Sequence, residues 1–186
     1  DLDNENLIKE AYRNGVPMGA DLVSKGEKIP NFLVWAQRDK NGAPLQRVQI
    51  IKGSIDKFTG RPSEVVYDVA CSNGLEVDSV TNRCPDNGAT VSIETCEISR
   101  DVGSAELKAV WQDPNFDKDE KAFYYVRVLE NPSCPWQIWD AIKAGKKPRP
   151  DLAKPFQERA WSSPIWYLPS LKNPGGAFTI ENILDN

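Results

Sequence analysis

The stretch from residue 113 to residue 119 has the side chains most typical of a metal site. Oxygen-bearing side chains occupy every second position of it, namely Asp113, Asn115, Asp117 and Asp119. Carboxylate and amide oxygens at this spacing begin many calcium-binding loops. However, Lys118 replaces the glycine that makes the sharp turn of such a loop, and Tyr124 replaces the glutamate at its twelfth position. These departures favour an acidic turn between two strands, and the four residues are weak metal candidates.

Aromatic side chains are concentrated in the last third of the chain. The group consists of Trp136, Trp139, Trp161, Trp166 and Tyr167. Exposed aromatic rings beside amides can form a platform for sugar rings or for a partner protein. Large aromatic side chains more often bury most of their surface in a core. We favour the core interpretation and keep these five residues as a candidate binding surface.

Two arginines lie within or next to apolar segments, where a charge usually needs a partner. Arg127 and Arg159 are the two, and the candidate partners are Glu130, Asp140 and Glu158. We favour structural ion pairs over a ligand clamp. The same three carboxylates could cleave a glycoside only if two of them lay about 5–10 Å apart. The sequence does not place them that close.

The sequence contains no histidine. A Ser-His-Asp or Cys-His catalytic site is therefore impossible within this chain, and so is a histidine-rich zinc or iron site. No motif supports a Ser–Lys site built from Ser72, Ser162 or Ser163 with Lys52 or Lys154. We therefore expect no catalytic residue, no resident cofactor and no complete active site in the chain.

The sequence contains four cysteines, at positions 71, 84, 96 and 134. None is part of a CxxC pair, and their wide spacing argues against a zinc site. Four cysteines allow three pairings. Cys71 and Cys84 bracket a polar segment that a bridge across its ends would tether. We favour Cys71–Cys84 with Cys96–Cys134, and hence an exported, periplasmic or extracellular protein, over the other pairings or four free thiols.

Alternation of apolar and polar residues predicts a mainly β chain. The predicted strands cover residues 32–37, 47–52, 64–70, 89–98, 105–112 and 122–130, with a final edge strand at 161–168. The pair Asn41–Gly42 predicts a hairpin between the first two strands. Short helices are predicted at residues 4–14, with Asn4 as a cap, and at 136–144, before Gly145.

This order of elements predicts an Ig-like antiparallel β-sandwich with short helices at the N-terminus and in the C-terminal third, because no strand–helix–strand alternation appears. Residues 1–30 are expected to form a helix and a connecting arm, 31–168 the sandwich domain, and 169–186 a C-terminal arm.

The chain has 186 residues, of which 40% are hydrophobic, and a formal net charge of −4. An acidic surface offers no attraction to a phosphate backbone, so we expect no nucleic-acid partner. No apolar run reaches the roughly 20 residues that cross a bilayer. A homo-oligomer is left open. The first residue is Asp1 rather than methionine, so we expect a processed chain or a fragment,.

Several strings of residues resemble a bacterial family known as domain-of-unknown-function family 3604. They are GVPMGADL (15–22), LQRVQIIKG (45–53), VYDVACS (66–72), CPDNGATV (84–91), AFYYVRVLENPSCPW (122–136) and QERAWSSPIWY (157–167). Members of that family look like longer, often exported proteins. Their N-terminal part resembles the PHP (polymerase and histidinol phosphatase) metallohydrolases, which hold metal ions with histidine and aspartate.

The present chain resembles only the C-terminal part of those proteins, and no metal ligand carries over to any position here. The resemblance implies a non-catalytic accessory β-domain that packs against the N-terminal catalytic domain of the same parent protein, a metal-dependent hydrolase. The alternative is a carbohydrate- or protein-binding module that uses the late tryptophans.

Overall fold

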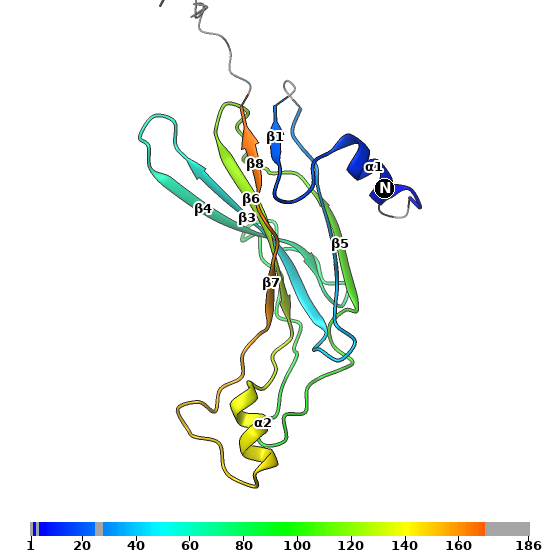
Figure 1. Ribbon diagram of the computed structural model, residues 1–186, viewed down its shortest axis with the longest axis vertical. Coiled ribbons are helices and arrows are strands. Elements are labelled where there is room, and N and C mark those ends of the chain that lie inside the picture. The colour runs from blue at the N-terminus through cyan, green and yellow to red at the C-terminus, as the bar shows by residue number, and fades with distance from the viewer. Residues whose placement is uncertain (1, 3, 25–27, 170–186) are drawn as a thin grey trace, which may run out of the picture.

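The computed structural model describes residues 2, 4–24 and 28–169, and within them it contains eight strands in two sheets and two short helices (Figure 1). The strands are β1 (Asp21–Val23), β2 (Phe32–Gln37), β3 (Leu45–Ile55), β4 (Pro62–Cys71), β5 (Glu106–Trp111), β6 (Ala122–Glu130), β7 (Arg159–Trp161) and β8 (Ile165–Leu168). The helices are α1 (Leu7–Asn14) and α2 (Trp136–Lys143). The predicted arm at 169–186 lies outside the described residues beyond Pro169.

The larger sheet is built around β6. Its strands follow the order β1-β8-β6-β3-β4, and β7 pairs with β6 beside β8. One edge of β6 pairs with β3 along most of its length, while the other is shared by β8, at Ala122–Tyr124, and β7, at Arg127–Leu129. All pairs are antiparallel except β1 with β8. Aromatic and β-branched residues fill β6, which suits a strand paired on both edges.

The smaller sheet consists of β2 and β5 and covers the inner face of the larger sheet (Figure 1). Side chains from both sheets form one core, because successive residues of a strand point to opposite faces. Its buried members are Phe32, Val34, Leu45, Val48, Ile50, Leu107, Ala122, Tyr124 and Tyr167. The predicted mainly β sandwich with two short helices is confirmed.

Beyond one end of the sandwich, residues 85–103 and 131–158 form a lobe that contains α2 (Figure 1). Its buried centre consists of Cys96, Cys134 and Ile138, and the two cysteines form a disulfide. A second disulfide, Cys71–Cys84, ties the end of β4 to the following loop, with a Cα–Cα distance of 5.6 Å. Both bridges match the pairing that the sequence favours.

The predicted hairpin between the first two strands is wrong. β2 pairs with β5, and β3 pairs with β4 and β6, so the first two strands lie in different sheets. A two-residue hairpin with an Asn-Gly turn needs positive φ at both positions. Neither Asn41 nor Gly42 has positive φ. Instead, the Asn41 N–H donates to Asp39 Oδ1 at 2.9 Å, in a turn that takes the chain across to the other sheet.

The predicted strand at residues 89–98 is also absent from the structure. Only one isolated bridge forms there, between Val91 and Ile98. Cys96 has a φ of 59°, which no strand residue adopts, and its N–H donates to Ser92 O at 2.7 Å in a turn. The disulfide to Cys134 holds this turn in the lobe, so the apolar residues of the segment pack on the lobe centre.

The predicted final edge strand is two strands, β7 and β8, with Pro164 between them. β8 is not an edge, since β1 pairs with it in parallel on its far side. β1 itself falls in the segment predicted to be an arm. The first helix ends as expected before Gly15, but Asn4 is not its cap. Asn4 Oδ1 accepts the Asn6 N–H at 2.8 Å, before the helix begins.

Candidate functional site

The acidic run begins with a buried ion pair. The Asp113 side chain is fully buried, and Lys52 Nζ lies 2.7 Å from its Oδ2 atom. The Tyr124 hydroxyl donates to the same oxygen at 2.8 Å, and the Asn115 N–H donates to Oδ1 at 2.8 Å. Burial, and next the charge of Asp113, raise the pKa of Tyr124 well above its usual range. Protein donors therefore occupy both oxygens of Asp113.

The rest of the acidic run also has partners within the protein. The Asn115 Nδ2 group donates to the Tyr67 hydroxyl at 3.1 Å. Asp117 pairs with Lys57 at 2.8 Å, and this hydrogen bond lowers the pKa of Asp117. Asp119 contributes its backbone N–H to Asp117 Oδ1 at 2.9 Å. The run is the turn between β5 and β6, and no group of three or more metal-ligating side chains gathers among the described residues.

The structure divides the five late aromatic residues among three places. Trp136 and Trp139 lie on α2 in the lobe, where both are exposed. Trp161 and Trp166 lie on β7 and β8 and are also exposed. Tyr167 is in the sandwich core, and its hydroxyl donates to Lys118 O at 2.9 Å. The five residues therefore do not form one surface.

Trp161 and Trp166 share the outer face of the larger sheet. Trp161 is in register with Arg127 of β6, and Trp166 is in register with Phe123. The ring of Phe123 lies 5.2 Å from Trp166. Phe123 also covers Gly53 of β3, where the ring leaves no room for a Cβ atom. Two exposed tryptophans and a phenylalanine thus form an aromatic row across β6, β7 and β8.

Arg127 has a different partner from the three carboxylates that the sequence suggests. Its Nε group donates to Gln49 Oε1 at 2.7 Å, and Gln49 Nε2 donates to Asp68 Oδ1 at 2.6 Å. Asp68 is buried and also pairs with Arg47 at 3.0 Å. The prediction that Glu130, Asp140 or Glu158 neutralises Arg127 is therefore wrong.

Asp68 is a buried carboxylate, and so a candidate site residue, that the sequence analysis does not identify. A carboxylate between Tyr67 and Val69 of β4 is itself a signal, because a buried charge in a strand needs partners. Besides Arg47 and Gln49, it accepts the Cys84 N–H at 2.7 Å. The Asp68 network thereby joins β3 and β4 to the loop that the Cys71–Cys84 disulfide closes. These contacts connect parts of the fold and leave no open site for a ligand at Asp68.

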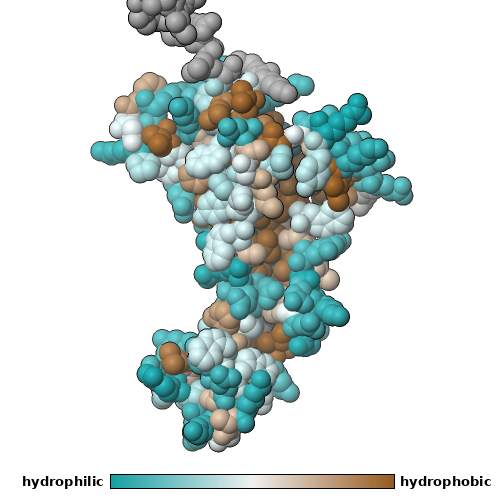
Figure 2. All heavy atoms as spheres, in the orientation of Figure 1, coloured by the Kyte–Doolittle hydropathy of each residue, from teal (hydrophilic) through white to brown (hydrophobic). Residues whose placement is uncertain are grey.

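A groove with a volume of about 1680 Å³ lies between the two sheets. It opens along β2 on one side and along β6, β7, β8 and β1 on the other. Figure 2 shows a band of hydrophobic residues through the middle of the molecule, with more polar residues on either side. The apolar lining residues include Leu22, Val34, Ala36, Val126, Val128 and Ile165. The sandwich is thus open along this side.

One wall of the groove is an unpaired strand edge. The Arg38 N–H bonds to Ala105 O at 3.0 Å, on the side of β5. Because backbone groups of an antiparallel strand alternate in direction, those of Leu33, Trp35 and Gln37 point away from β5. Within the part of the chain that the structure describes, no strand pairs with this edge of β2.

The end of the groove nearest the lobe has two carboxylates, and Arg159 lines the groove beside them. Glu130, at the end of β6, and Glu158, just before β7, both line it. Glu130 Oε2 accepts the Ala43 N–H at 3.2 Å. Partial burial raises the pKa of Glu130, and the nearby charge of Glu158 raises it further. In the described chain, neither carboxylate has a salt-bridge partner.

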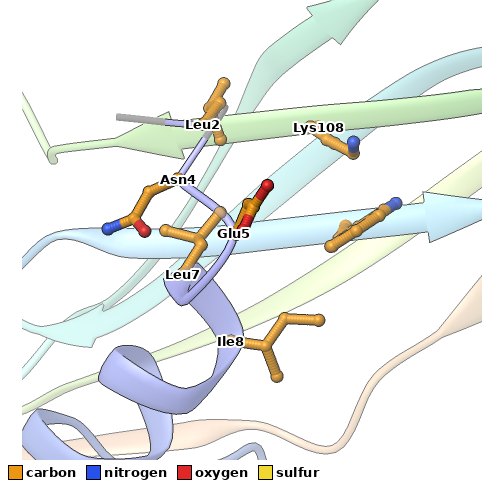
Figure 3. Close-up of a pocket in the computed structure, with 7 residues that line it drawn as sticks. Leu2, Asn4, Glu5, Leu7, Ile8 and Lys108 are labelled. Atoms are coloured by element: carbon orange, nitrogen blue, oxygen red, sulfur yellow. The ribbon is translucent and has the colours of Figure 1, made fainter.

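A smaller pocket of about 330 Å³ lies where α1 meets the outer face of the smaller sheet (Figure 3). Leu2, Asn4, Glu5, Leu7 and Ile8 line it from the N-terminal segment. Lys108 lines it from β5, but this ammonium lies 3.1 Å from Glu106 and 4.0 Å above the ring of Trp35. Because the ammonium of Lys108 already has Glu106 and the Trp35 ring as partners, this shallow pocket is a weaker candidate for ligand binding than the groove.

Comparison with known protein families identifies a match. Residues 1–169 match the family described as "Protein of unknown function (DUF3604)". No curated protein and no solved structure matches the chain. Among the described residues, no helix is long and apolar enough to cross a bilayer.

Proposed function

Because the chain belongs to the DUF3604 family, we propose that it is a non-catalytic accessory β-domain of a larger, exported metal-dependent hydrolase related to the PHP family. Its role is to dock onto the N-terminal catalytic domain of the same parent protein and to shape one wall of that domain's cleft. The histidines and aspartates that hold the metal would belong to the catalytic domain, because this chain contains no histidine.

The open groove is the observation that supports a docking role most directly. Soluble monomeric domains rarely leave a large apolar recess exposed, and such surfaces are typical of protein interfaces. Here the recess combines apolar walls with a strand edge that has no partner among the described residues. Burying both would stabilise a complex with a second domain.

The polar residues are consistent with a supporting role rather than chemistry of their own. The two buried carboxylates, Asp113 and Asp68, are held by Lys52 and Arg47 with neutral donors around them. A catalytic acid or base must be free to exchange a proton with a substrate. These carboxylates instead stabilise the sandwich.

Export is supported by the cysteines. The two disulfides are consistent with an oxidising compartment, the periplasm or the outside of the cell,. The intact mass of the protein from its native host gives a first test. A chain far heavier than 20.8 kDa with an N-terminal domain rich in histidine supports the proposal, whereas a native mass near that value contradicts it.

The decisive test compares the parent hydrolase with and without this domain. The catalytic part and the present chain are produced separately, mixed, and examined for co-elution and metal-dependent hydrolysis. We expect a stable complex and activity that the isolated catalytic part lacks. A catalytic part that is fully active alone, and that does not bind this chain, would refute the accessory role.

The aromatic row on the outer face of the larger sheet favours one second candidate, a carbohydrate-binding module. Trp161 and Trp166 lie beside β6 residues four positions apart, which corresponds to roughly 13 Å along the strand. Two exposed rings at such a distance can stack on separate sugars of one oligosaccharide. Oligosaccharide titrations should quench fluorescence in the native chain and in a Trp136→Ala control, but not in a Trp161→Ala/Trp166→Ala variant. Flat titrations across a glycan panel would rule this candidate out.

A further inference from the structure

The free edge of β2 and the apolar groove beside it form a single surface. It offers a ligand both backbone hydrogen bonds and apolar contacts. The edge offers the backbone N–H and C=O groups of Leu33, Trp35 and Gln37. The groove offers apolar side chains from both sheets. An extended strand is the one form of polypeptide that uses both, since its backbone pairs while alternate side chains point to one face.

We propose that the groove binds an extended polypeptide segment of the parent protein's catalytic domain, which adds to the edge of β2 as a third strand of the smaller sheet. Its alternate residues are apolar and fill the groove, and a lysine or arginine at one end lies next to Glu130 and Glu158. This inference rests on the proposed docking role and names the surface that performs it.

The dimensions of the groove fit one strand. β2 contains six residues, which span roughly 20 Å at the rise of a β-strand,. An added strand of this length would place about three side chains in the groove. Those side chains would contact Val126 and Val128 of β6 and Ile165 of β8, which line the opposite wall.

The acidic end of the groove fits a basic residue. Glu130 and Glu158 lie at the end of the groove where β6 finishes, and the described residues provide neither with an ion pair. A cation from the added strand would relieve their mutual repulsion. Arg159 lines the same groove, and the charge of Arg38 acts on Glu130, but neither arginine forms a salt bridge with the two glutamates in the described chain. A cation from the added strand would therefore still have carboxylates to pair with.

The position of α1 argues against a second whole copy of the chain as the occupant. Leu7, Ile8, Ala11 and Tyr12 of α1 line the groove, and Leu7 and Ile8 also line the smaller pocket beside Trp35 of β2. A second sandwich that approached the edge of β2 would have to clear this helix. A single strand is narrower than a second sandwich and needs less room beside this helix.

A synthetic peptide, RTVTVTVTR, tests the inference on the full chain of 186 residues. The peptide alternates valine and threonine and has arginine at both ends, so that either strand direction places a cation at Glu130. We expect binding with one-to-one stoichiometry and roughly tenfold or greater slowing of amide exchange at Leu33, Trp35 and Gln37. Binding without slowing at these amides, or no binding, would overturn the inference.

Two proline variants provide a matched pair. Leu33→Pro removes an N–H from the free edge of β2, where it has no hydrogen-bond partner among the described residues,. Val110→Pro, opposite Leu33 in the register, removes an N–H from the far edge of β5. We expect Leu33→Pro to abolish peptide binding and Val110→Pro to preserve it. Equal loss in both variants, with both folded by circular dichroism, would contradict strand addition at β2.

Charge variants test the acidic end. A Glu130→Gln/Glu158→Gln variant should bind RTVTVTVTR several-fold more weakly at low salt, whereas a peptide with threonine in place of both arginines should bind both proteins equally. Unchanged affinity in the variant would overturn the charged part of the inference.

Two further outcomes identify a different occupant and would overturn the proposal. If the β2 amides are already protected in the full chain but exchange rapidly in a chain ending at residue 169, the segment 170–186 fills the groove. If their protection rises with protein concentration, a second copy does. Binding of the catalytic part that persists in Leu33→Pro would leave the docking role standing and remove only the surface proposed here.

Discussion

The β-sandwich and the lobe around α2 differ in what maintains their shape. The sandwich has nine buried residues in one cluster and long backbone ladders on both sides of β3. The lobe has a buried centre of three residues, two of which are the halves of a disulfide. A unit that small cannot bury enough apolar surface to offset its conformational entropy. The comparison teaches that the crosslink substitutes for a core where the chain cannot build one.

The treatment of charge differs as well. The sandwich buries Lys52 and Asp113 as a pair, whereas the lobe exposes its charges. The lobe residues Lys146, Lys147 and Arg149 lie on the loop after α2, and all three are exposed. Removing a charge should therefore damage the sandwich far more than the lobe, while removing a disulfide should have its main effect on the lobe.

Asp113→Ala should have the largest effect, because it leaves the ammonium of Lys52 buried without its closest partner. We expect the free energy of unfolding of the whole sandwich to fall by about 3–5 kcal/mol. Urea denaturation followed by tryptophan fluorescence measures it. A Lys52→Met/Asp113→Leu variant should lose much less, since neither charge then remains. A loss below about 1 kcal/mol for Asp113→Ala would mean that the pair is solvated.

Replacing Cys96 and Cys134 by serine should have the second largest effect, confined to the lobe. The bridge joins residues 38 positions apart. Closing a loop of that length lowers unfolded-state entropy by an amount worth up to about 4 kcal/mol. We expect amide exchange in α2 to approach unprotected rates while β3 and β6 remain protected. Equal acceleration in both regions would show that the lobe and the sandwich unfold as one unit.

The opposite end of the sandwich provides a weak ion pair for comparison. Lys57 and Asp117 pair at 2.8 Å, and both side chains are more than 40% exposed. Solvent screening makes the contribution of such a pair to stability small. Asp117→Ala should therefore shift the urea midpoint only slightly, and 0.5 M sodium chloride should remove most of the difference. A loss as large as that of Asp113→Ala would contradict the contrast between buried and exposed charge.

Glu130→Gln should have the smallest effect, and it acts where the sandwich meets the lobe. Partial burial raises the folded-state pKa of Glu130 above its ordinary value of 4.5. Ionised Glu130 therefore destabilises the fold above that raised pKa, and the cost disappears as pH falls below the ordinary value. The variant should be slightly more stable at pH 7, by less than about 0.5 kcal/mol, and equal to the native chain near pH 4. Thermal denaturation across this range checks the sign.

Local patterns in the sequence predicted the elements that local forces determine. The bounds of β6 agree with the prediction residue for residue, because aromatic and β-branched residues fill the strand. The start of α2 at Trp136 agrees as well. The disulfide pairing also agrees. Cys71 and Cys84 bracket a short polar segment, and this local pattern was enough to predict the bridge between them.

Most of the features that sequence reasoning missed depend on distant neighbours. The choice of partner for β2 depends on β5, which follows more than 60 residues later. β1 is a strand of three residues that exists because β8 lies beside it. The Asp68 network and the groove likewise require the positions of several strands at once. No periodicity within one segment contains that information.

The parallel pairing of β1 with β8 has a mechanical consequence. The chain enters at the start of β1 and leaves at the end of β8, and the two strands point the same way. A pull along the chain from both sides therefore loads their hydrogen bonds in shear, all together rather than one after another. The bonds at either end of the pair, from Trp166 N–H to Ala20 O and from Ser24 N–H to Leu168 O, measure 3.1 and 2.9 Å. The β1–β8 pair should therefore resist tension between the two ends of the domain. Single-molecule pulling would measure this resistance as a high unfolding force.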